Sequence, residues 1–481
     1  MSSCEFAYTD RIHRQEGRWV IKMTAEMTTQ LVVIIVILVT AIFSGAPVMA
    51  AIGGTAIFAM LLFFDTPFFD HFARMAYQSA TRAEFLISPL FLLMSEFLSK
   101  GGLAEDIFAV MHKLLNKVKG GLAMATTLAC TIFAALCGSS PATAASVGVI
   151  ATSSMTKRKY RKDFAIGTVA GGGTLGIMIP PSMTLVGYGI LTETSVAKLL
   201  IAGILPGLML SGIMLIMIFL RSRLNPALIG EVDAAFLDSK KYKPDDYAVD
   251  LRNPPLEAEV VSGDEYKALL RRVWPSFVLI LVVLGSLYFG ITTATEAAAL
   301  GAVGAFLLTC LNRRMSKSVM GTSIQSAAKT ACMMIFLMVG GRGLTFVLAY
   351  LGIPGAMTTM IAQSGLNRYV ILFMLYILWF ILGCLMDPGS MSLLTVPFLF
   401  TTMTAGLGFD PIWLGIVSTL MTEVGMITPP VGLNIFVLRA STKVEMKYII
   451  SGVWPYVLAL LLGLLLLTVF PQIALVLPGM M

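Results

Sequence analysis

Long apolar runs recur along this chain from one end to the other. Residues inside them show neither strict alternation nor a one-sided helical stripe, and a helix needs about 20 apolar residues to cross a bilayer. Several runs are shorter than this or are broken by glycine and proline, which is typical of re-entrant hairpins and interrupted helices. The pattern predicts an all-α polytopic membrane protein with runs at 30–50, 51–64, 84–99, 121–137, 142–155, 164–191, 197–220, 273–291, 295–311, 323–350, 368–386, 389–404, 411–428 and 447–470.

One polar segment divides the apolar pattern into two parts. Residues 221–272 hold 19 of the 61 charged side chains. Arginine pairs stand at both ends of this segment, and basic residues beside membrane spans face the cytoplasm. We therefore expect a polar N-terminal leader (1–28), a first membrane repeat (29–220), a cytoplasmic linker (221–272) and a second membrane repeat (273–481).

The two apolar parts resemble each other in sequence. At an offset of 249 residues, GIMIPPSMTL (176–185) aligns with GMITPPVGLN (425–434), and Ile201, Gly203 and Pro206 match residues 450, 452 and 455. Upstream, CGSSPAT (137–143) corresponds to CLMDPGS (384–390). A matched series at one offset indicates an internal repeat.

The basic residues indicate that the second repeat is inverted. Five of them precede the first Pro-Pro segment, within residues 157–162, whereas the matching loop at 405–412 has none. After the Pro-Pro segments the bias reverses, because residues 192–198 carry one lysine while Arg439, Lys443 and Lys447 follow the second. Inverted repeats with broken segments at matching positions are typical of secondary transporters, with the binding site at the repeat interface near the bilayer midplane.

The broken segments carry the chemistry that such a site needs. Half-helix N-termini present N–H groups to an anion, and unwound backbone presents carbonyl oxygens to Na⁺. Ser140-Pro141 and Asp387-Pro388 each have the pattern of an N-cap followed by a first-turn proline. Carboxylates inside a membrane are costly and usually functional, which singles out Asp387 and Glu423.

Each of these features also has a plainer interpretation. Ser140 and Asp387 could serve only as helix caps, the glycines only as close packing contacts, and Pro-Pro only as a kink. Glu96 and Arg342, which also fall in apolar runs, could be interface anchors or structural ion pairs. The sequence alone leaves these alternatives open.

Other classes of function lack support in the sequence. GGGTLG (171–176) has the spacing of a dinucleotide-binding loop, but no strand precedes it, and no P-loop motif occurs. The six cysteines form no CxxC pair and the three histidines are scattered, so the sequence predicts neither a disulfide framework nor a zinc site, and we expect no cofactor. With 57% hydrophobic and 13% charged residues, the chain is not a soluble domain. Nothing suggests a nucleic-acid partner or an enzyme.

The densest motifs resemble the large membrane subunit of tripartite ATP-independent periplasmic (TRAP) transporters. They are ALCGSSPATAASVGVIA (135–151), GGGTLGIMIPPS (171–182), LMDPGSMSLLTVP (385–397) and TEVGMITPPVGLNIFVL (422–438). The resemblance implies an elevator-type transporter in the bacterial inner membrane that imports an organic acid anion with Na⁺. It implies two partners besides the lipid bilayer: a small four-helix membrane subunit and a periplasmic binding protein that delivers the substrate.

The resemblance also implies where substrate and Na⁺ bind. The hairpin tips and the two Pro-Pro breaks would line the site, with Na⁺ near Ser139, Gly173, Asp387 and Gly425. The residues so implied are Gly138, Ser139, Ser140, Pro141, Thr143, Gly172, Gly173, Thr174, Gly176, Pro180 and Pro181 in the first repeat, and Asp387, Pro388, Ser390, Glu423, Gly425, Thr428, Pro429, Pro430 and Asn434 in the second.

The main alternative is a stand-alone Na⁺/dicarboxylate symporter, which would share the inverted repeat but need no binding protein. A membrane-embedded enzyme would need a catalytic constellation, and a passive channel would conduct without a Na⁺ gradient. The sequence leaves the substrate, the Na⁺ stoichiometry and the oligomeric state open.

Overall fold

The computed structural model describes residues 12–15, 18–21, 24–64, 67–231, 243–247, 263–429 and 432–481. Within these ranges the chain is helical, apart from a two-stranded antiparallel hairpin in the leader, β1 (Ile12–Gln15) and β2 (Arg18–Ile21). Seven of the described helices are long and apolar enough to cross a membrane, or eight if the bent pair over residues 83–115 counts as one span. The prediction of an all-α polytopic membrane protein is therefore confirmed.

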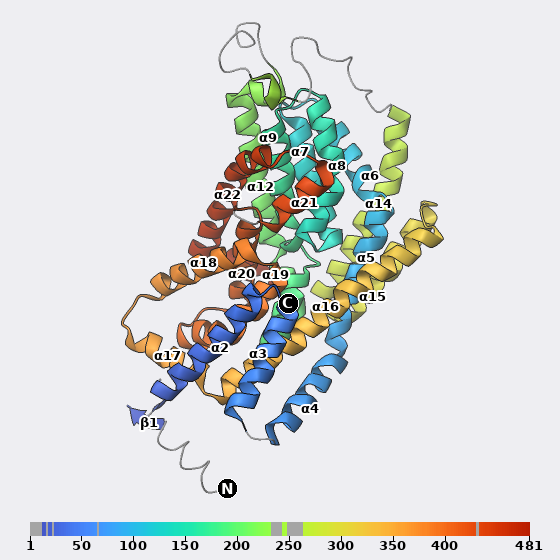
Figure 1. Ribbon diagram of the computed structural model, residues 1–481. Helices are drawn as coiled ribbons and strands as arrows, with labels where there is room; N and C mark the ends of the chain where they lie inside the picture. The colour runs from blue at the N-terminus through green and yellow to red at the C-terminus, as the bar shows by residue number, and fades with distance from the viewer. Residues whose placement is uncertain are drawn as a thin grey trace.

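The first part of the chain builds its helices in the order expected of broken spans (Figure 1). The elements are α2 (Ala25–Phe43), α3 (Val48–Phe63), α4 (Pro67–Thr81), η1 (Ala83–Leu86), α5 (Ile87–Lys100), α6 (Leu103–Leu115), α7 (Gly121–Cys137), α8 (Ser140–Lys157), α9 (Lys162–Gly173), η2 (Thr174–Ile177), α10 (Met183–Thr192), α11 (Val196–Ala202), α12 (Ile204–Leu224) and η3 (Pro226–Ile229).

The rest of the chain, from the polar segment onward, follows a similar order. Its elements are η4 (Pro244–Asp246), α14 (Gly263–Tyr288), α15 (Ala294–Leu311), α16 (Lys317–Tyr350), α17 (Ile353–Gln363), α18 (Arg368–Leu385), α19 (Pro388–Thr401), the π-helical turn η5 (Thr402–Gly406), α20 (Pro411–Met426), α21 (Leu433–Thr442), α22 (Met446–Val469) and α23 (Gln472–Gly479). Helix α12 extends to Leu224 and α14 begins at Gly263, so both ends of segment 221–272 are helical. The division into four domains stays a prediction.

The repeat seen in the sequence is a repeat of helices. The broken hairpin α7–α8 corresponds to α18–α19, the interrupted helix α9–α10 corresponds to α20–α21, and α11 with α12 corresponds to α22. Helices from different repeats pack against one another, since α9 contacts α22, α8 contacts α21, and α10 contacts α19. The two repeats are therefore interlocked rather than placed side by side.

The basic loops gather at the end of the molecule that carries the polar segment. Lys119 Nζ lies 2.8 Å from Glu231 Oε2. Lys162 Nζ and the Tyr448 hydroxyl both donate to the Asp245 carbonyl oxygen, each at 2.7 Å. The loop after α8 and the loop before α22 thus lie on the same face, which basic residues assign to the cytoplasm.

The ends of the second hairpin lie on the opposite face. The guanidinium of Arg368, at the start of α18, lies 5.5 Å from the Phe409 ring, which follows α19. Figure 1 shows the start of α18, beside α17, toward the end of the molecule that carries the N-terminus, away from the polar segment. The α7–α8 hairpin therefore enters from the cytoplasmic face and α18–α19 from the other face. This arrangement confirms the inverted topology that the loop charges predicted.

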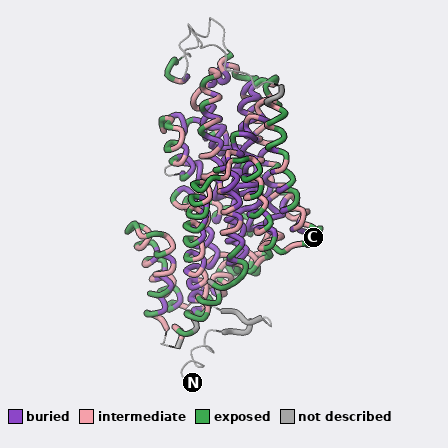
Figure 2. Tube along the Cα trace, turned by 90° about the vertical axis from the view of Figure 1, so that its right-hand side faces the viewer, coloured by how far each residue is buried: buried purple, intermediate pink, exposed green. Residues whose placement is uncertain are grey.

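Buried residues gather in the interior of the helical body, and exposed residues lie mainly on its outside (Figure 2). Helices α9 and α20 are almost entirely buried, whereas α2, α14 and α18 expose large apolar side chains along one face. Apolar surface of this extent is stable where lipid covers it. The interrupted helices that carry the candidate site are thus shielded by an outer layer of spans.

Candidate functional site

The tip of the first hairpin rests on the Pro-Pro break of its own repeat. Gly138 joins α7 to α8 with φ +67°, and a Cβ there would meet the Pro181 carbonyl oxygen. A Cβ on Gly176 would lie 2.6 Å from the Ser139 carbonyl oxygen and 2.8 Å from Ser140 Cα. Only glycine allows this approach of backbone to backbone, so the structure brings these predicted site residues together.

The second hairpin makes the equivalent contact in its repeat. A Cβ on Gly425 would lie 2.6 Å from Gly383 Cα and 2.8 Å from the Cys384 nitrogen. The Gly432 N–H donates to the Cys384 carbonyl oxygen at 3.2 Å. Both hairpins therefore press their broken ends against an unwound segment, as the sequence repeat predicted.

One side-chain contact joins the two repeats at this level. The Ser140 hydroxyl lies within hydrogen-bonding reach of Glu423 Oε1 and of the Thr174 carbonyl oxygen, the latter at 3.3 Å. Thr174 and Glu423 are equivalent at the 249-residue offset, so Ser140 contacts the same position of both repeats. Ser140 and Glu423 are both buried.

The structure corrects the cap predicted for the first hairpin. The N-cap position of α8 belongs to Ser139, which makes no side-chain cap, while Ser140 is the first helical residue and Pro141 the second. The Ser140 hydroxyl is turned toward Glu423 instead of the helix N–H groups. A charged or strongly polar acceptor across the interface therefore outweighs the local cap.

Several buried polar atoms of α8, α20 and α21 have no hydrogen-bond partner among the described residues. They include Glu423 Oε2, Thr143 Oγ1, and Asn434 Oδ1 and Nδ2. An unpaired polar atom in an apolar interior costs about 1–3 kcal/mol. Carboxylate, hydroxyl and amide oxygens are chemically suited to coordinate a desolvated Na⁺.

Asp387 occupies the predicted cap of the second hairpin. Its Oδ2 accepts from the Ser390 N–H at 3.1 Å and its Oδ1 from the Ser390 hydroxyl at 2.5 Å. The cap prediction for Asp387 is therefore confirmed. Asp387 also lines a narrow pocket between α10, α16 and α19, together with Thr184 and Ser392.

Ser392 is a polar residue of this pocket that the sequence did not single out. Its buried hydroxyl has no partner among the described residues. The repeat gives no signal for it, because its counterpart in the first repeat is alanine at an offset of either 247 or 248. Only the packing of α19 against α10 and α16 reveals it.

Other candidate residues serve mainly in packing or local bonds. Gly172 and Gly173 remain within α9 and lie against α7 and α8, where a Cβ on Gly173 would be 2.7 Å from the Ala144 Cβ. The Thr428 hydroxyl bonds to the Val424 carbonyl oxygen at 2.5 Å. Pro180, Pro181 and Pro429 lie in the two breaks and Pro388 in the first turn of α19, while Pro430 lies outside the described residues. Their roles in binding stay predictions.

The two intramembrane charges that the sequence left open have different surroundings. Glu96 Oε2 lies 2.9 Å from Lys100 Nζ, one turn along the same helix, which matches a structural ion pair. Arg342 Nη2 donates to the Ile190 carbonyl oxygen of another helix at 2.7 Å. Arg342 therefore connects α16 to the end of α10.

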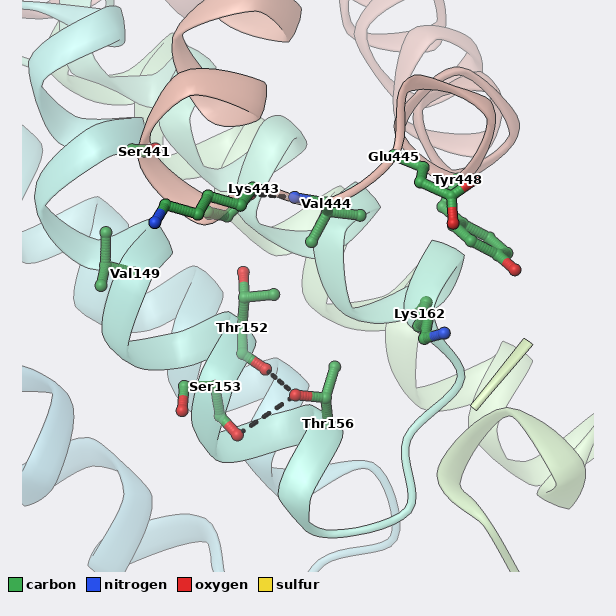
Figure 3. Close-up of a pocket in the computed structure, with 11 residues that line it drawn as sticks. Val149, Thr152, Ser153, Thr156, Lys162, Ser441, Lys443, Val444, Glu445 and Tyr448 are labelled. Atoms are coloured by element: carbon green, nitrogen blue, oxygen red, sulfur yellow. Dashed lines mark hydrogen bonds between the residues drawn. The ribbon is translucent and has the colours of Figure 1, made fainter. Parts of the chain in front are cut away.

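A cavity of about 370 Å³ opens at the cytoplasmic end of the repeat interface. Figure 3 shows Thr152, Ser153 and Thr156 of α8 on one wall and the segment from Lys443 to Tyr448 on the other. The Thr152 hydroxyl is buried and has no partner among the described residues. Because α8 begins at Ser140, this cavity lies at the far end of the helix that starts at the candidate site.

Comparison with known proteins identifies the family. The model of the tripartite ATP-independent periplasmic transporter, DctM component, matches residues 31–473. The chain belongs to this family. It is 34% identical to the C4-dicarboxylate TRAP transporter large permease protein DctM of Pseudomonas aeruginosa, over 84% of this chain and 88% of that protein. It is 31% identical to the protein of the same description from Rhodobacter capsulatus, over 92% and 98%.

More distant matches extend the comparison. The isethionate TRAP transporter permease protein DctMQ of Oleidesulfovibrio alaskensis is 29% identical over 90% of this chain and 64% of that protein. The fold resembles the crystal structure of the Alcanivorax borkumensis YdaH transporter, with a TM-score of 0.57, 13% identity, and coverage of 85% and 89% of the two chains. This TRAP large permease is thus a multi-pass protein of the bacterial inner membrane.

Proposed function

We propose that this TRAP large permease imports a small organic acid anion together with Na⁺ and acts as a transporter, without catalysing a reaction. The observation that carries the proposal is the buried contact of Ser140 with Glu423 and Thr174, together with the unpaired buried polar atoms of Thr143 and Asn434. The carboxylate and hydroxyl oxygens would coordinate Na⁺ as a co-substrate. The N-termini of α8 and α19 would face the anion with their positive dipole ends.

The relatives support a substrate class. Three of them, 30–34% identical to this chain, are described as C4-dicarboxylate permeases, which supports a carboxylate as the transported group. Two others are described as an ectoine and a sialic acid TRAP transporter large permease. Both of these molecules also carry a carboxylate. We propose that the permease recognises an anionic acid group, which is a carboxylate in these molecules and a sulfonate in isethionate, the molecule named for DctMQ.

We further propose that the chain works with two partners. A periplasmic binding protein would deliver the substrate and a small membrane subunit would complete the permease. The relative named DctMQ is longer than this chain, as a fusion of the large and small subunits would be. An elevator movement of the hairpins and interrupted helices against the outer helices would carry the substrate across.

The test is uptake into proteoliposomes that contain this chain and its small subunit. A thermal-shift screen of the binding protein first identifies the acid. We then expect saturable uptake of that acid only when the binding protein and an inward Na⁺ gradient are both present. Robust uptake without the binding protein would support the stand-alone symporter instead, and unsaturable flux without Na⁺ would support a channel.

A further inference from the structure

A large cavity that adjoins the repeat core opens on the face opposite the basic loops. It has a volume of about 590 Å³, which is within the usual range for small-molecule sites. Its walls come from the end of α10, the start of α11, the start of α15 and the turn η1 before α5. Arg82 and Glu193 are among the residues that line it.

Glu193 stands between two arginines without a hydrogen bond to either. Its Oε1 lies 3.8 Å from Arg82 Nη1 and 3.8 Å from Arg342 Nη2. Strong charge-assisted pairs have N–O distances of about 2.7–2.9 Å. The Glu193 side chain is 71% exposed, whereas that of Arg342 is only 12% exposed. The carboxylate is therefore a loosely held counter-ion that can turn into solvent at small cost.

The position of Glu193 is also locally unfavourable. It caps the C-terminal end of α10 with φ +56°, a conformation that costs energy for any residue with a Cβ. A helix C-terminus favours a cation, not a carboxylate. The equivalent residue after α21, at an offset of 250, is Lys443 with φ +59°, which has the favourable sign. The local helix therefore does not explain a glutamate at this position.

Arg342 places a cation at the C-terminal end of α10, where Glu193 places a carboxylate. It also keeps one N–H donor without an acceptor. Its Nη2 caps α10 through the Ile190 carbonyl oxygen. Its Nε is buried and has no acceptor among the described residues. A buried guanidinium N–H without an acceptor is costly, and a second carboxylate placed between the two arginines would remove that cost.

We infer that this cavity is an outer vestibule that binds a carboxylate anion, with Glu193 as the displaceable stand-in. The incoming carboxylate takes hydrogen bonds from Arg82, which lines the cavity, and from Arg342, which lies behind Glu193 and outside the cavity lining, and Glu193 turns outward. The inference rests on the proposed function, because it makes the site a staging point for the transported acid.

The vestibule leads toward the candidate site along one helix. Leu191 of α10 lies one residue beyond Ile190, and it lines the pocket that also contains Asp387 and Ser392. Met338, one turn before Arg342 on α16, lines the same pocket. Arg342 therefore lies between the outer cavity and the second hairpin tip. The cytoplasmic cavity at Lys443 occupies the corresponding position after α21, so the inverted repeat supplies one opening to each side.

The test measures protection of a cysteine in the cavity wall from a neutral thiol reagent. Ala197→Cys, or Thr295→Cys on another wall, is introduced into the full chain with Cys4, Cys310 and Cys332 replaced by serine. The complex with the small subunit is reconstituted in nanodiscs and labelled with N-ethylmaleimide. Succinate is the probe and butane-1,4-diol its uncharged control. We expect succinate, but not the diol, to slow labelling about fivefold or more at saturation.

Charge variants then locate the anion. Glu193→Gln removes the competing carboxylate, so the half-protecting succinate concentration should fall by about tenfold. Arg82→Gln or Arg342→Lys should raise it by about tenfold or more. Arg368→Gln, which removes an arginine that neither lines the cavity nor lies beside Glu193, should leave it unchanged.

Two results would overturn the inference. Succinate fails to protect either cysteine in both the parent and Glu193→Gln, or it protects the Arg82 and Arg342 variants as well as the parent. The proposed function fails separately, if the parent complex shows no Na⁺-driven uptake in proteoliposomes while the protection experiment succeeds.

Discussion

At the scale of the residue, Glu423 is the centre of the candidate site. One carboxylate oxygen faces Ser140 and the other has no partner among the described residues. The sequence identified Glu423 because a carboxylate in an apolar run is rare. It could not identify Ser140 as its partner, since 283 residues separate them. It also assigned Ser140 to a cap that Ser139 occupies.

Glu423→Gln should weaken the coupling of uptake to Na⁺ and leave the fold intact. The amide keeps an oxygen for the Ser140 hydroxyl but loses the charge that would hold Na⁺, so we expect the Na⁺ concentration for half-maximal uptake to rise by about tenfold or more. Thermal stability should change little. Glu423→Ala leaves the Ser140 hydroxyl with only the Thr174 carbonyl oxygen and should cost about 1–3 kcal/mol of unfolding free energy. Unchanged Na⁺ dependence in Glu423→Gln would show that the carboxylate is only structural.

Gly176 provides a test of close packing at the same site. In Gly176→Ala the new Cβ would lie 2.6–2.8 Å from the backbone of Ser139 and Ser140, which cannot move without shifting the hairpin tip. We expect a loss of about 1–3 kcal/mol of stability together with a loss of uptake. Gly212→Ala is the matched control, because a Cβ there meets nothing within 4 Å. That variant should be stabilised by about 0.5–1 kcal/mol.

At the scale of the element, the start of α19 combines a cap with a possible ion ligand. Asp387 and Asp410 both cap helices that begin with proline, α19 and α20. Removing either cap should therefore cost a similar free energy, about 0.5–2 kcal/mol. The repeat predicted the broken hairpins and their proline-led second helices, because N-cap and first-turn preferences are local properties of the sequence.

The two caps should differ in transport. Asp387→Asn keeps an oxygen acceptor for the Ser390 N–H, so the helix start should survive while Na⁺ dependence weakens. Asp410→Asn should keep both the helix start and the Na⁺ dependence of uptake. Uptake against Na⁺ concentration, measured beside thermal unfolding of each variant, checks this difference. If Asp387→Asn and Asp410→Asn behave alike in both measurements, Asp387 is a cap and nothing more.

At the scale of the whole molecule, the inversion of the repeats is the feature that loop charges predicted best. Lys117 before the first hairpin and Ser364 before the second are equivalent at an offset of 247, and the structure places their hairpins at opposite ends. The two hairpins take opposite ends because moving basic loops across the membrane is costly.

Labelling of intact cells tests this topology. Cysteines at positions 117 and 364 are introduced one at a time into the chain with its exposed Cys310 and Cys332, and the leader residue Cys4, replaced. A membrane-impermeant maleimide added outside spheroplasts should modify Ser364→Cys and leave Lys117→Cys unmodified. After permeabilisation both should react. Equal labelling of both positions in intact spheroplasts would contradict the inverted arrangement.

The sequence by itself determined the membrane class, the two inverted repeats and the positions of the helix breaks. These properties depend on apolar run length, on the side taken by basic loops and on the local preferences of proline and glycine. The tertiary structure decided which breaks meet, that Ser140 bridges to Glu423, and that Arg342 joins the end of α10 beside Glu193. Such contacts arise when interlocked helices pack, and packing brings together residues whose separation along the chain carries no signal.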